Sequence, residues 1–251
     1  MKDIDEIEAA IRLSRCKGIG ASMFKNLIDK YKKPSIALEE WKKNQIKYRN
    51  TAVSEKKNNT EQSIIKTLKG LINKEFQAFY YGQSSYPSQL NSLTEPPPIV
   101  YLSTTLRKMP LAAVVGSRNA SLEQIELAKM YTLNLIKEGY GIVSGGAKGI
   151  DRVAHETAIK ANAYTLAVLA NGLDIIYPKE HKELFEIIKK KGALMTELMI
   201  GAQPQKGFFP TRNRLIAAMA EIVVVLPSTN SSGSLITAKW ANKLGKKLVC
   251  A

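Results

Sequence analysis

Short apolar runs alternate with amphipathic segments from about residue 73 onward. Consecutive apolar positions predict strands, and apolar positions three or four apart predict helices. The expected strands are 76–81, 99–102, 111–116, 140–143, 164–169, 193–196, 221–226 and 247–250. The expected helices are 121–138, 150–161, 180–190, 211–220 and 233–244. Parallel strands covered on both faces read as continuous apolar runs, so the pattern predicts a doubly wound, mostly parallel, Rossmann-like α/β sheet.

The first 72 residues follow a helical pattern throughout. The repeating positions are Ile4, Ile7 and Ile11, then Phe24, Leu27, Ile28 and Tyr31. Residues 17–20, Lys-Gly-Ile-Gly, resemble the turn of a helix-hairpin-helix element, which either gives amides to phosphate or serves packing alone. The wholly polar residues 54–62 predict an exposed loop. We therefore expect a small all-helical domain over 1–72, SAM-like or helix-hairpin-helix-like, and a Rossmann-like domain over 73–251.

The charge balance points to an anionic partner. The chain carries a net charge of +15 and a pI of about 9.7, which suits nucleic acid, a membrane surface or phosphorylated ligands, although a genome rich in lysine codons gives the same surplus. Cys16 and Cys250 lack CxxC spacing, which excludes a zinc ribbon and fits a reducing compartment. Without a secretory core or an apolar run of about 18–20 residues, we expect a cytoplasmic protein with no membrane association.

Candidate binding residues stand in the loops that follow strands. In an open α/β sheet, ligands bind beyond the carboxyl ends of the strands, where free N–H groups at helix starts attract anions. The first such loop holds Gly116, Ser117 and Arg118. Ser121 and Gln124 predict a capping box that fixes the next helix start. Arg118 is therefore expected just before a helix N-terminus.

A glycine-rich loop follows the next strand, over residues 144–151. Gly145, Gly146 and Gly149 allow the backbone to approach a ligand closely and to direct its amides toward it, and Lys148 adds charge. The spacing matches neither the dinucleotide-binding nor the P-loop pattern. A plain tight turn therefore remains the alternative.

A third loop covers residues 171–177. Asn171, Gly172 and Tyr177 place a turn and an aromatic ring near a strand end. Two interpretations stay open. The ring and the turn meet a ligand, or Tyr177 packs the loop while Asp174 caps a helix.

The fourth loop leads into a helix that carries Arg212, Asn213 and Arg214. We expect both arginines in the first helical turn, where the macrodipole disfavours cations and a bound anion would explain them. Planar guanidinium groups suit phosphate, so at least one is predicted to face a ligand and the other an internal acid. Residues 231–237 form a small-residue helix start that donates to phosphate or only caps the helix.

These motifs, in this order, resemble the DprA/Smf family of DNA-processing proteins. The matching residues are Tyr86-Pro87, Pro96–Pro98, Gly116–Arg118, Ser144–Asp151 with Ala154-His155, Gly172–Asp174 with Tyr177-Pro178, Phe209–Arg214 and Ser232–Ala238. The resemblance covers roughly residues 76–251. Two features depart from the family pattern. Ala170-Asn171 stand where two small residues, commonly Gly-Cys, are usual. Members also continue past the position of Ala251, so we expect a naturally short form or a piece of a longer protein.

The resemblance implies a protein that binds single-stranded DNA without sequence preference. It implies protection of incoming DNA during competence and natural transformation, loading of the RecA recombinase for DNA recombination, and a homodimer. No catalytic residue, cofactor or metal is expected. Mapped by motif, the DNA-binding residues are Gly116, Ser117, Arg118, Gly145, Gly146, Lys148, Gly149, Asn171, Gly172, Tyr177, Arg212, Asn213 and Arg214.

The two histidines, a run of lysines and the loop over residues 227–237 allow other interpretations. His155 stands four residues after Asp151 and so suggests an acid–base pair or, as we favour, a structural hydrogen bond that fixes the glycine loop. His181 is expected to be exposed, and Lys189–Lys191 to form a solvated face or to attract DNA at long range. The alternatives are a phosphoribohydrolase-like enzyme, weakened because residues 227–237 lack that group's Pro-Gly-Gly-x-Gly-Thr-x-x-Glu loop, and a nucleotide-sensing module.

Overall fold

The computed structural model describes residues 2–47, 57–226 and 232–251. The chain divides into two compact units, Met1–Tyr101 and Leu102–Ala251. The first unit therefore holds two strands in addition to its helices, and the domain boundary expected after residue 72 stays a prediction. None of the helices within the described ranges is long and apolar enough to cross a membrane.

The first unit is built mainly of helices. Its elements are α1 (Lys2–Ser14), α2 (Ala21–Tyr31), α3 (Pro34–Lys47), α4 (Lys57–Ile72), β1 (Gln77–Tyr80), a 3-10 turn (Ser88–Ser92) and β2 (Ile99–Leu102). Ile11, Phe24 and Ile28 are buried, so the predicted apolar stripes form the core. Phosphate contact by the turn at residues 17–20 stays a prediction.

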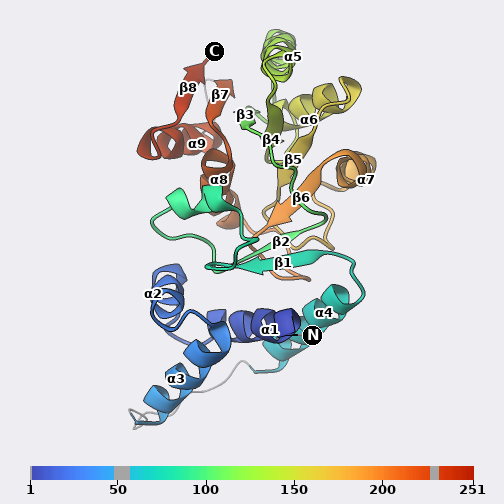
Figure 1. Ribbon diagram of the computed structural model, residues 1–251. Coiled ribbons are helices and arrows are strands. Elements are labelled where there is room, and N and C mark those ends of the chain that lie inside the picture. Colours follow the sequence, from blue (N-terminus) through green and yellow to red (C-terminus); the bar gives the residue numbers. More distant parts are fainter. Residues whose placement is uncertain (1, 48–56, 227–231) are drawn as a thin grey trace. The chain divides into compact units, whose positions relative to one another are not determined.

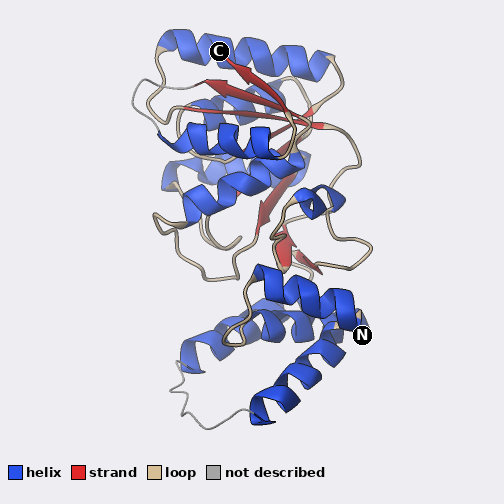
Figure 2. Cartoon of the chain, turned by 90° about the vertical axis from the view of Figure 1, so that its left-hand side faces the viewer, coloured by secondary structure: helices blue, strands red, loops and turns tan. Residues whose placement is uncertain are grey.

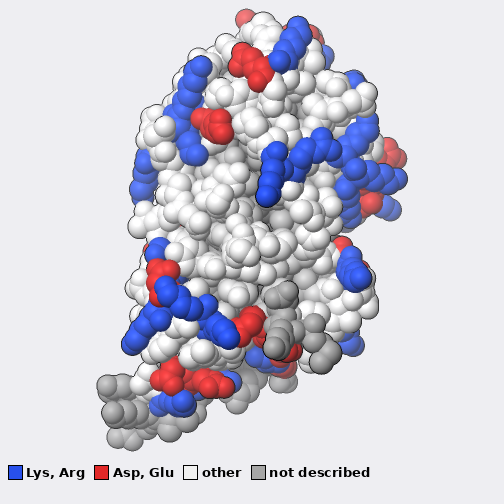
Figure 3. Space-filling view, viewed as in Figure 1, with Lys and Arg blue, Asp and Glu red and all other residues white. Residues whose placement is uncertain are grey.

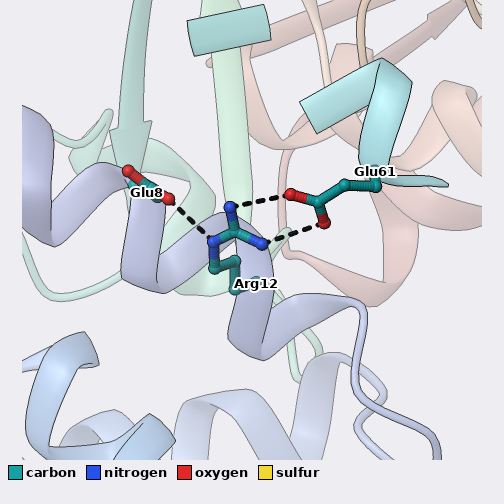
Figure 4. A network of polar contacts seen from close by, with 3 residues as sticks. All are labelled: Glu8, Arg12 and Glu61. Carbon is teal, nitrogen blue, oxygen red and sulfur yellow. Dashed lines mark hydrogen bonds and ion pairs between the residues drawn. The ribbon is translucent and has the colours of Figure 1, made fainter. Parts of the chain in front are cut away.

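The prediction of an exposed loop over 54–62 is wrong for residues 57–62, which belong to α4, and residues 54–56 lie outside the described residues. Polar residues continue a helix as long as one face becomes buried farther on, as it does at Ile64. A carboxylate from this segment also holds α4 to α1. The Arg12 guanidinium donates to Glu61 at 3.0 Å through both terminal nitrogens and to Glu8 at 2.8 Å through Nε (Figure 4).

The second unit contains a parallel sheet with the strand order β6-β5-β4-β3-β7-β8. These strands are β3 (Leu111–Gly116), β4 (Gly141–Ser144), β5 (Thr165–Val168), β6 (Ala193–Thr196), β7 (Ile222–Leu226) and β8 (Lys247–Cys250). The central strands are buried along their whole length. The predicted doubly wound, mostly parallel fold is confirmed.

Helices cover both faces of this sheet, as Figures 1 and 2 show. They are α5 (Leu122–Lys137), α6 (Ile150–Lys160), α7 (Lys182–Lys191), α8 (Phe208–Met219) and α9 (Ser232–Lys243). In Figure 1, α5, α6 and α7 lie on one side of the strands, and α8 and α9 lie on the other. Ala128 of α5 and Ala154 of α6 pack against Val114 and Ile142 of the sheet. Small residues on these helices let them approach the strands closely.

The predicted strands and helices of the second unit are confirmed, with most ends shifted by about one or two residues. The largest shift is at α8, which begins at Phe208. The arginines 212 and 214 therefore lie in the second helical turn, and the prediction of the first turn is wrong. Proline is tolerated at the start of a helix, because the first N–H groups have no intrahelical acceptor, so Pro210 does not delay the helix.

Candidate functional site

The strand order of the second unit reverses direction between β3 and β7. The chain continues from β3 through β4 and β5 to β6 on one side, whereas β7 and β8 lie on the other. The helices that follow β3 and β7, α5 and α9, therefore cover opposite faces of the sheet at this switch point (Figure 1), which is where open α/β sheets bind ligands. A groove of about 840 Å³ lies here. Its walls include Ser117, Arg118, Ala147, Tyr177, Phe209 and Asn213. The loop after β7, residues 227–231, lies outside the described residues.

A row of one cation and two rings lines the groove. The guanidinium carbon of exposed Arg118 lies 4.9 Å from the centre of the Phe209 ring. That centre is 5.8 Å from the centre of the Tyr177 ring, and Tyr177 is 41% exposed. Arg118 has no carboxylate within ion-pair distance among the described residues. Its charge and the Tyr177 ring thus remain accessible to a ligand.

The start of α5 is fixed as predicted. The Gln124 N–H donates to Ser121 Oγ at 3.2 Å, and the Ser121 N–H donates to Gln124 Oε1 at 3.0 Å, which completes the capping box. Ser117 is 3% exposed, and its hydroxyl oxygen accepts from the Asn119 N–H at 3.0 Å. The hydroxyl of Ser117 therefore shapes the loop that presents Arg118.

The glycine loop packs directly against the loop after β3. Gly149 has φ +73°, and a Cβ there would lie 2.1 Å from the Ser117 carbonyl oxygen, so only glycine fits. The Ile150 N–H donates to that same carbonyl at 3.0 Å. Asp151 Oδ2 accepts from the Ala147 N–H at 3.3 Å and so bridges the loop to α6.

Arg212 lies beneath the glycine loop, where the sequence suggested a ligand-facing group. It is 5% exposed, and its Nη1 donates to the carbonyl oxygens of Gly145 and Val168. Burial lowers the pKa of Arg212 to about 10, against the opposing charge of Asp151, so it stays protonated at neutral pH. Burial likewise raises the pKa of Asp151, against the charge of Arg212. Arg212 therefore joins the glycine loop at Gly145 to the end of β5 at Val168.

Two further predicted cations face carboxylates. Arg214 pairs with Glu197, and both side chains are mostly buried. This matches the expectation that one of the two arginines would meet an internal acid. Lys148 is exposed but pairs with Glu180, which lowers the pKa of that carboxyl. The groove is therefore less cationic than the sequence suggested.

Hydrogen bonds within the third loop, residues 171–177, fix its shape. Asn171 is 2% exposed and donates through Nδ2 to the carbonyls of Gly172 at 3.0 Å and Ile175 at 2.7 Å. The Gly172 N–H donates to Ala202 O at 2.9 Å. Asn171 and Gly172 thus shape the loop, and Tyr177 is the member that reaches the groove.

Asn213 links α8 to α9. Its Nδ2 donates to the Gly233 carbonyl at 3.0 Å, and its Oδ1 accepts from Arg212 Nε at 3.1 Å. Asn213 also lines the groove, as do Gly116, Gly233 and the buried Ser234. The amide of Asn213 therefore connects the buried arginine to the start of α9.

Both histidines are buried. The expectation of an exposed His181 is wrong: it is 1% exposed and its Nδ1 lies 3.0 Å from the Gly146 carbonyl, which accepts the bond. A hydrogen bond of 2.7 Å joins His155 Nδ1 to Thr165 Oγ1 and not to Asp151, and burial lowers the pKa of His155 to about 3. The glycine loop is therefore fixed by Asp151 and His181, whereas His155 fastens α6 to β5.

Sequence reasoning missed two groove residues. Phe209 belongs to the motif 209–214, in which only Arg212, Asn213 and Arg214 are predicted to bind, and exposed Lys206 lies outside the motifs. A smaller pocket of about 70 Å³ also opens beside Phe209 and is lined by Gly145, Gly146 and Asn171. The available signal for Phe209 was an aromatic residue at the start of a helix that follows a strand end, a position that faces the ligand edge of such sheets.

Fold and site together define a doubly wound α/β protein with a groove at the switch point of its sheet. The sequence matches the family described as DNA recombination-mediator protein A over residues 77–251. The chain belongs to this family.

Individual relatives agree with this assignment. The DNA processing protein DprA of Bacillus subtilis is 36% identical over 166 residues, which is 65% of this chain and 56% of that protein. Its counterpart from Streptococcus pneumoniae is 37% identical over 180 residues, 70% of this chain and 64% of that protein. Protein Smf of Synechocystis is 38% identical over 167 residues, 64% of this chain and 42% of that protein. The chain thus matches about two fifths to two thirds of the length of these curated relatives.

Two solved structures are similar. The X-ray structure of DprA from Streptococcus pneumoniae aligns with a TM-score of 0.67 and 27% identity, over 98% of this chain and 81% of that one. A structure of DNA processing protein A from Helicobacter pylori aligns with a TM-score of 0.62 and 30% identity, over 70% of this chain and 81% of that one. The latter is described as giving insight into a single-stranded DNA binding mode.

Proposed function

We propose that the groove at the switch point binds single-stranded DNA without sequence preference. The observation that carries this proposal is the row formed by Arg118, Phe209 and Tyr177. A single strand offers phosphates for the cation and unstacked bases for the rings, and every base has a face that stacks. A duplex hides its base faces, so the same row favours the single strand.

The other predicted residues support the site in different ways. Arg118 contacts phosphate directly, with Lys206 as a second exposed cation in the wall. The backbone N–H groups of Gly145, Gly146 and Gly149 donate to phosphate oxygens in this proposal. Arg212 acts as a positioning residue, because its guanidinium donates to the carbonyls of Gly145 and Val168 and is buried away from the ligand.

We further propose that the protein serves the DNA-processing role of its family in natural transformation. In this role it protects the incoming strand, helps to load the RecA recombinase and acts as a homodimer. Family membership and the DNA-binding relative from Helicobacter pylori support this part.

A salt-titrated binding assay with matched single-stranded and duplex oligonucleotides tests the groove. We expect tighter binding of the single strand, with affinity that falls as salt rises because bound cations release counterions. Equal affinity for both forms, or saturable binding of a mononucleotide with none of the oligonucleotide, would contradict the proposal. Light scattering with and without oligonucleotide tests the homodimer.

A further inference from the structure

The edge of the sheet opposite the groove carries a second group of cations. In a parallel sheet of this kind, each helix ends and each strand begins at the same edge, here called the amino edge. Its Lys and Arg residues outside ion pairs are Arg107, Lys108, Lys137, Lys160, Lys190, Lys191, Lys243, Lys246 and Lys247. The acids in the same connections are Glu138 and Glu221. This edge is therefore strongly basic.

Within the described part of the chain, the cations of the amino edge have no carboxylate partners, although Lys191 and Lys246 donate to internal oxygens. Among the described residues, none of the nine lies within ion-pair distance of a carboxylate, whereas Lys148 and Arg214 at the opposite edge both do. All of them are exposed apart from Lys246, which is half-buried. In Figure 3, Lys and Arg atoms form a band that runs across the second unit toward the side where α7 lies in Figure 1.

Helix dipoles explain only part of this arrangement. Lysine in the last turn of a helix is favourable by some tenths of a kcal/mol, which accounts for residues such as Lys137 and Lys160. The same reason does not apply to Arg107 and Lys108, which precede β3 outside any helix, or to Lys247, which begins β8. Cations outside the helices thus extend the basic edge where no dipole requires them.

The chemistry of this edge differs from that of the groove. The Arg107 guanidinium lies 5.4 Å from the centre of the Tyr164 ring, and Tyr164 is only 4% exposed, so this ring offers no face to a base. With a strand spacing of about 4.8 Å, β6 and β8 stand about 24 Å apart along the edge. That length covers several phosphates, which are about 3.4 Å apart along one strand of a duplex.

We propose that the amino edge is a second nucleic-acid-binding surface, which contacts the phosphate backbone of single strands and duplexes alike. It extends the proposed function without depending on the groove. Binding here is electrostatic and insensitive to base identity, because contacts to phosphate carry no sequence information. The protein can then hold one nucleic acid segment in the groove and another at the opposite edge.

A pair of charge-neutralised variants tests this surface. The double variant Lys108→Gln/Lys190→Gln removes two exposed amino-edge charges, and the control Lys129→Gln/Lys239→Gln removes two exposed charges from the middle of α5 and α9. For a long duplex, we expect the amino-edge variant to lower the slope of log affinity against log salt by about 2, since each phosphate contact contributes about 0.9. The control keeps the wild-type slope.

A short thymidine oligonucleotide of about six nucleotides separates the two proposals, because it fills a single groove. Its affinity should be nearly the same in wild type and the amino-edge variant, because stacking on the groove rings dominates the binding of so short a single strand. If wild type does not bind it, the groove proposal fails while the amino-edge proposal stands on the duplex result. Equal duplex slopes for the two double variants would overturn the amino-edge proposal. So would loss of binding to phosphatidylserine vesicles with unchanged duplex binding, which would identify a membrane surface.

Discussion

The guanidinium of Arg118 faces the Phe209 ring at 4.9 Å, although the two residues come from different connections of the sheet. A cation over a ring at an exposed site gains about 0.5–1 kcal/mol, which is enough to bias the orientation of a long side chain. The contact keeps the guanidinium beside the ring in the wall of the groove. A planar guanidinium held there suits the recognition of phosphate.

Replacement of Arg118 tests the direct phosphate contact. Arg118→Ala should weaken binding similarly for different single-stranded sequences and should lower the salt slope by about 0.7, the value for one contact to a single strand. Arg118→Lys retains the charge and should keep the slope. Fluorescence anisotropy over a salt series measures both. Wild-type affinity in Arg118→Ala would remove this residue from the site.

The two rings should contribute through stacking. Tyr177→Leu and Phe209→Leu are each expected to cost about 1–3 kcal/mol of binding free energy if a base stacks on the ring, with no change in salt slope because no charge is removed. Tyr177→Phe preserves the ring and serves as the control. A fall in the slope, or wild-type affinity in both leucine variants, would argue against stacking.

Arg212 should matter first for stability. Arg212→Met leaves the carbonyls of Gly145 and Val168 without their donor, and each buried unsatisfied group costs about 1–3 kcal/mol, so we expect the free energy of unfolding to fall by about 2–5 kcal/mol. Exposed Arg152→Met should change it by less than about 0.5 kcal/mol. Urea denaturation compares them. Unchanged stability in Arg212→Met would show that the carbonyls do not need this cation.

Buried His155 should make the free energy of unfolding sensitive to acid. Its pKa is about 3 in the folded protein, below the ordinary value of 6.5. Because the unfolded chain gains a proton below about pH 6.5 and the folded protein does not, the stability linked to His155 is present above that pH and is lost as the pH falls toward 3.

Between pH 7 and pH 5, the wild type should therefore lose about 2 kcal/mol more stability than His155→Gln. The other titrating groups are common to both proteins and cancel in this comparison. Urea denaturation at the two pH values gives the difference. An equal loss in both proteins would show that His155 titrates normally when folded.

The glycine loop offers a test of backbone fit. Gly149→Ala places a Cβ against the Ser117 carbonyl at a positive φ and should destabilise the protein by at least about 1–3 kcal/mol. Gly207→Ala is the matched control, because nothing lies within 4 Å of its added Cβ and its φ is −69°. Thermal unfolding of the two variants compares them. Equal stability would mean that the two loops separate at little cost.

Local patterns predicted the elements of the second unit well. Continuous apolar runs such as 111–116 mark strands that are buried on both faces, and the spacing between Ser121 and Gln124 correctly predicted a capping box. The start of α8 was missed because Pro210 reads as a stop signal, although proline fits the first helical turn. The polar start of α4 was missed because an exposed helical turn needs no apolar residue.

Residue type and spacing along the chain are enough to predict the order of strands and helices, the loops that meet at one sheet edge and the excess of positive charge. How each charge is used follows only from the folded chain. Arg118 and Arg212 read alike in the sequence, yet one is exposed over Phe209 and the other is buried beneath the glycine loop. The reason is that burial and ion pairing depend on groups far away in the chain, such as Val168 and Glu197, which only folding brings near.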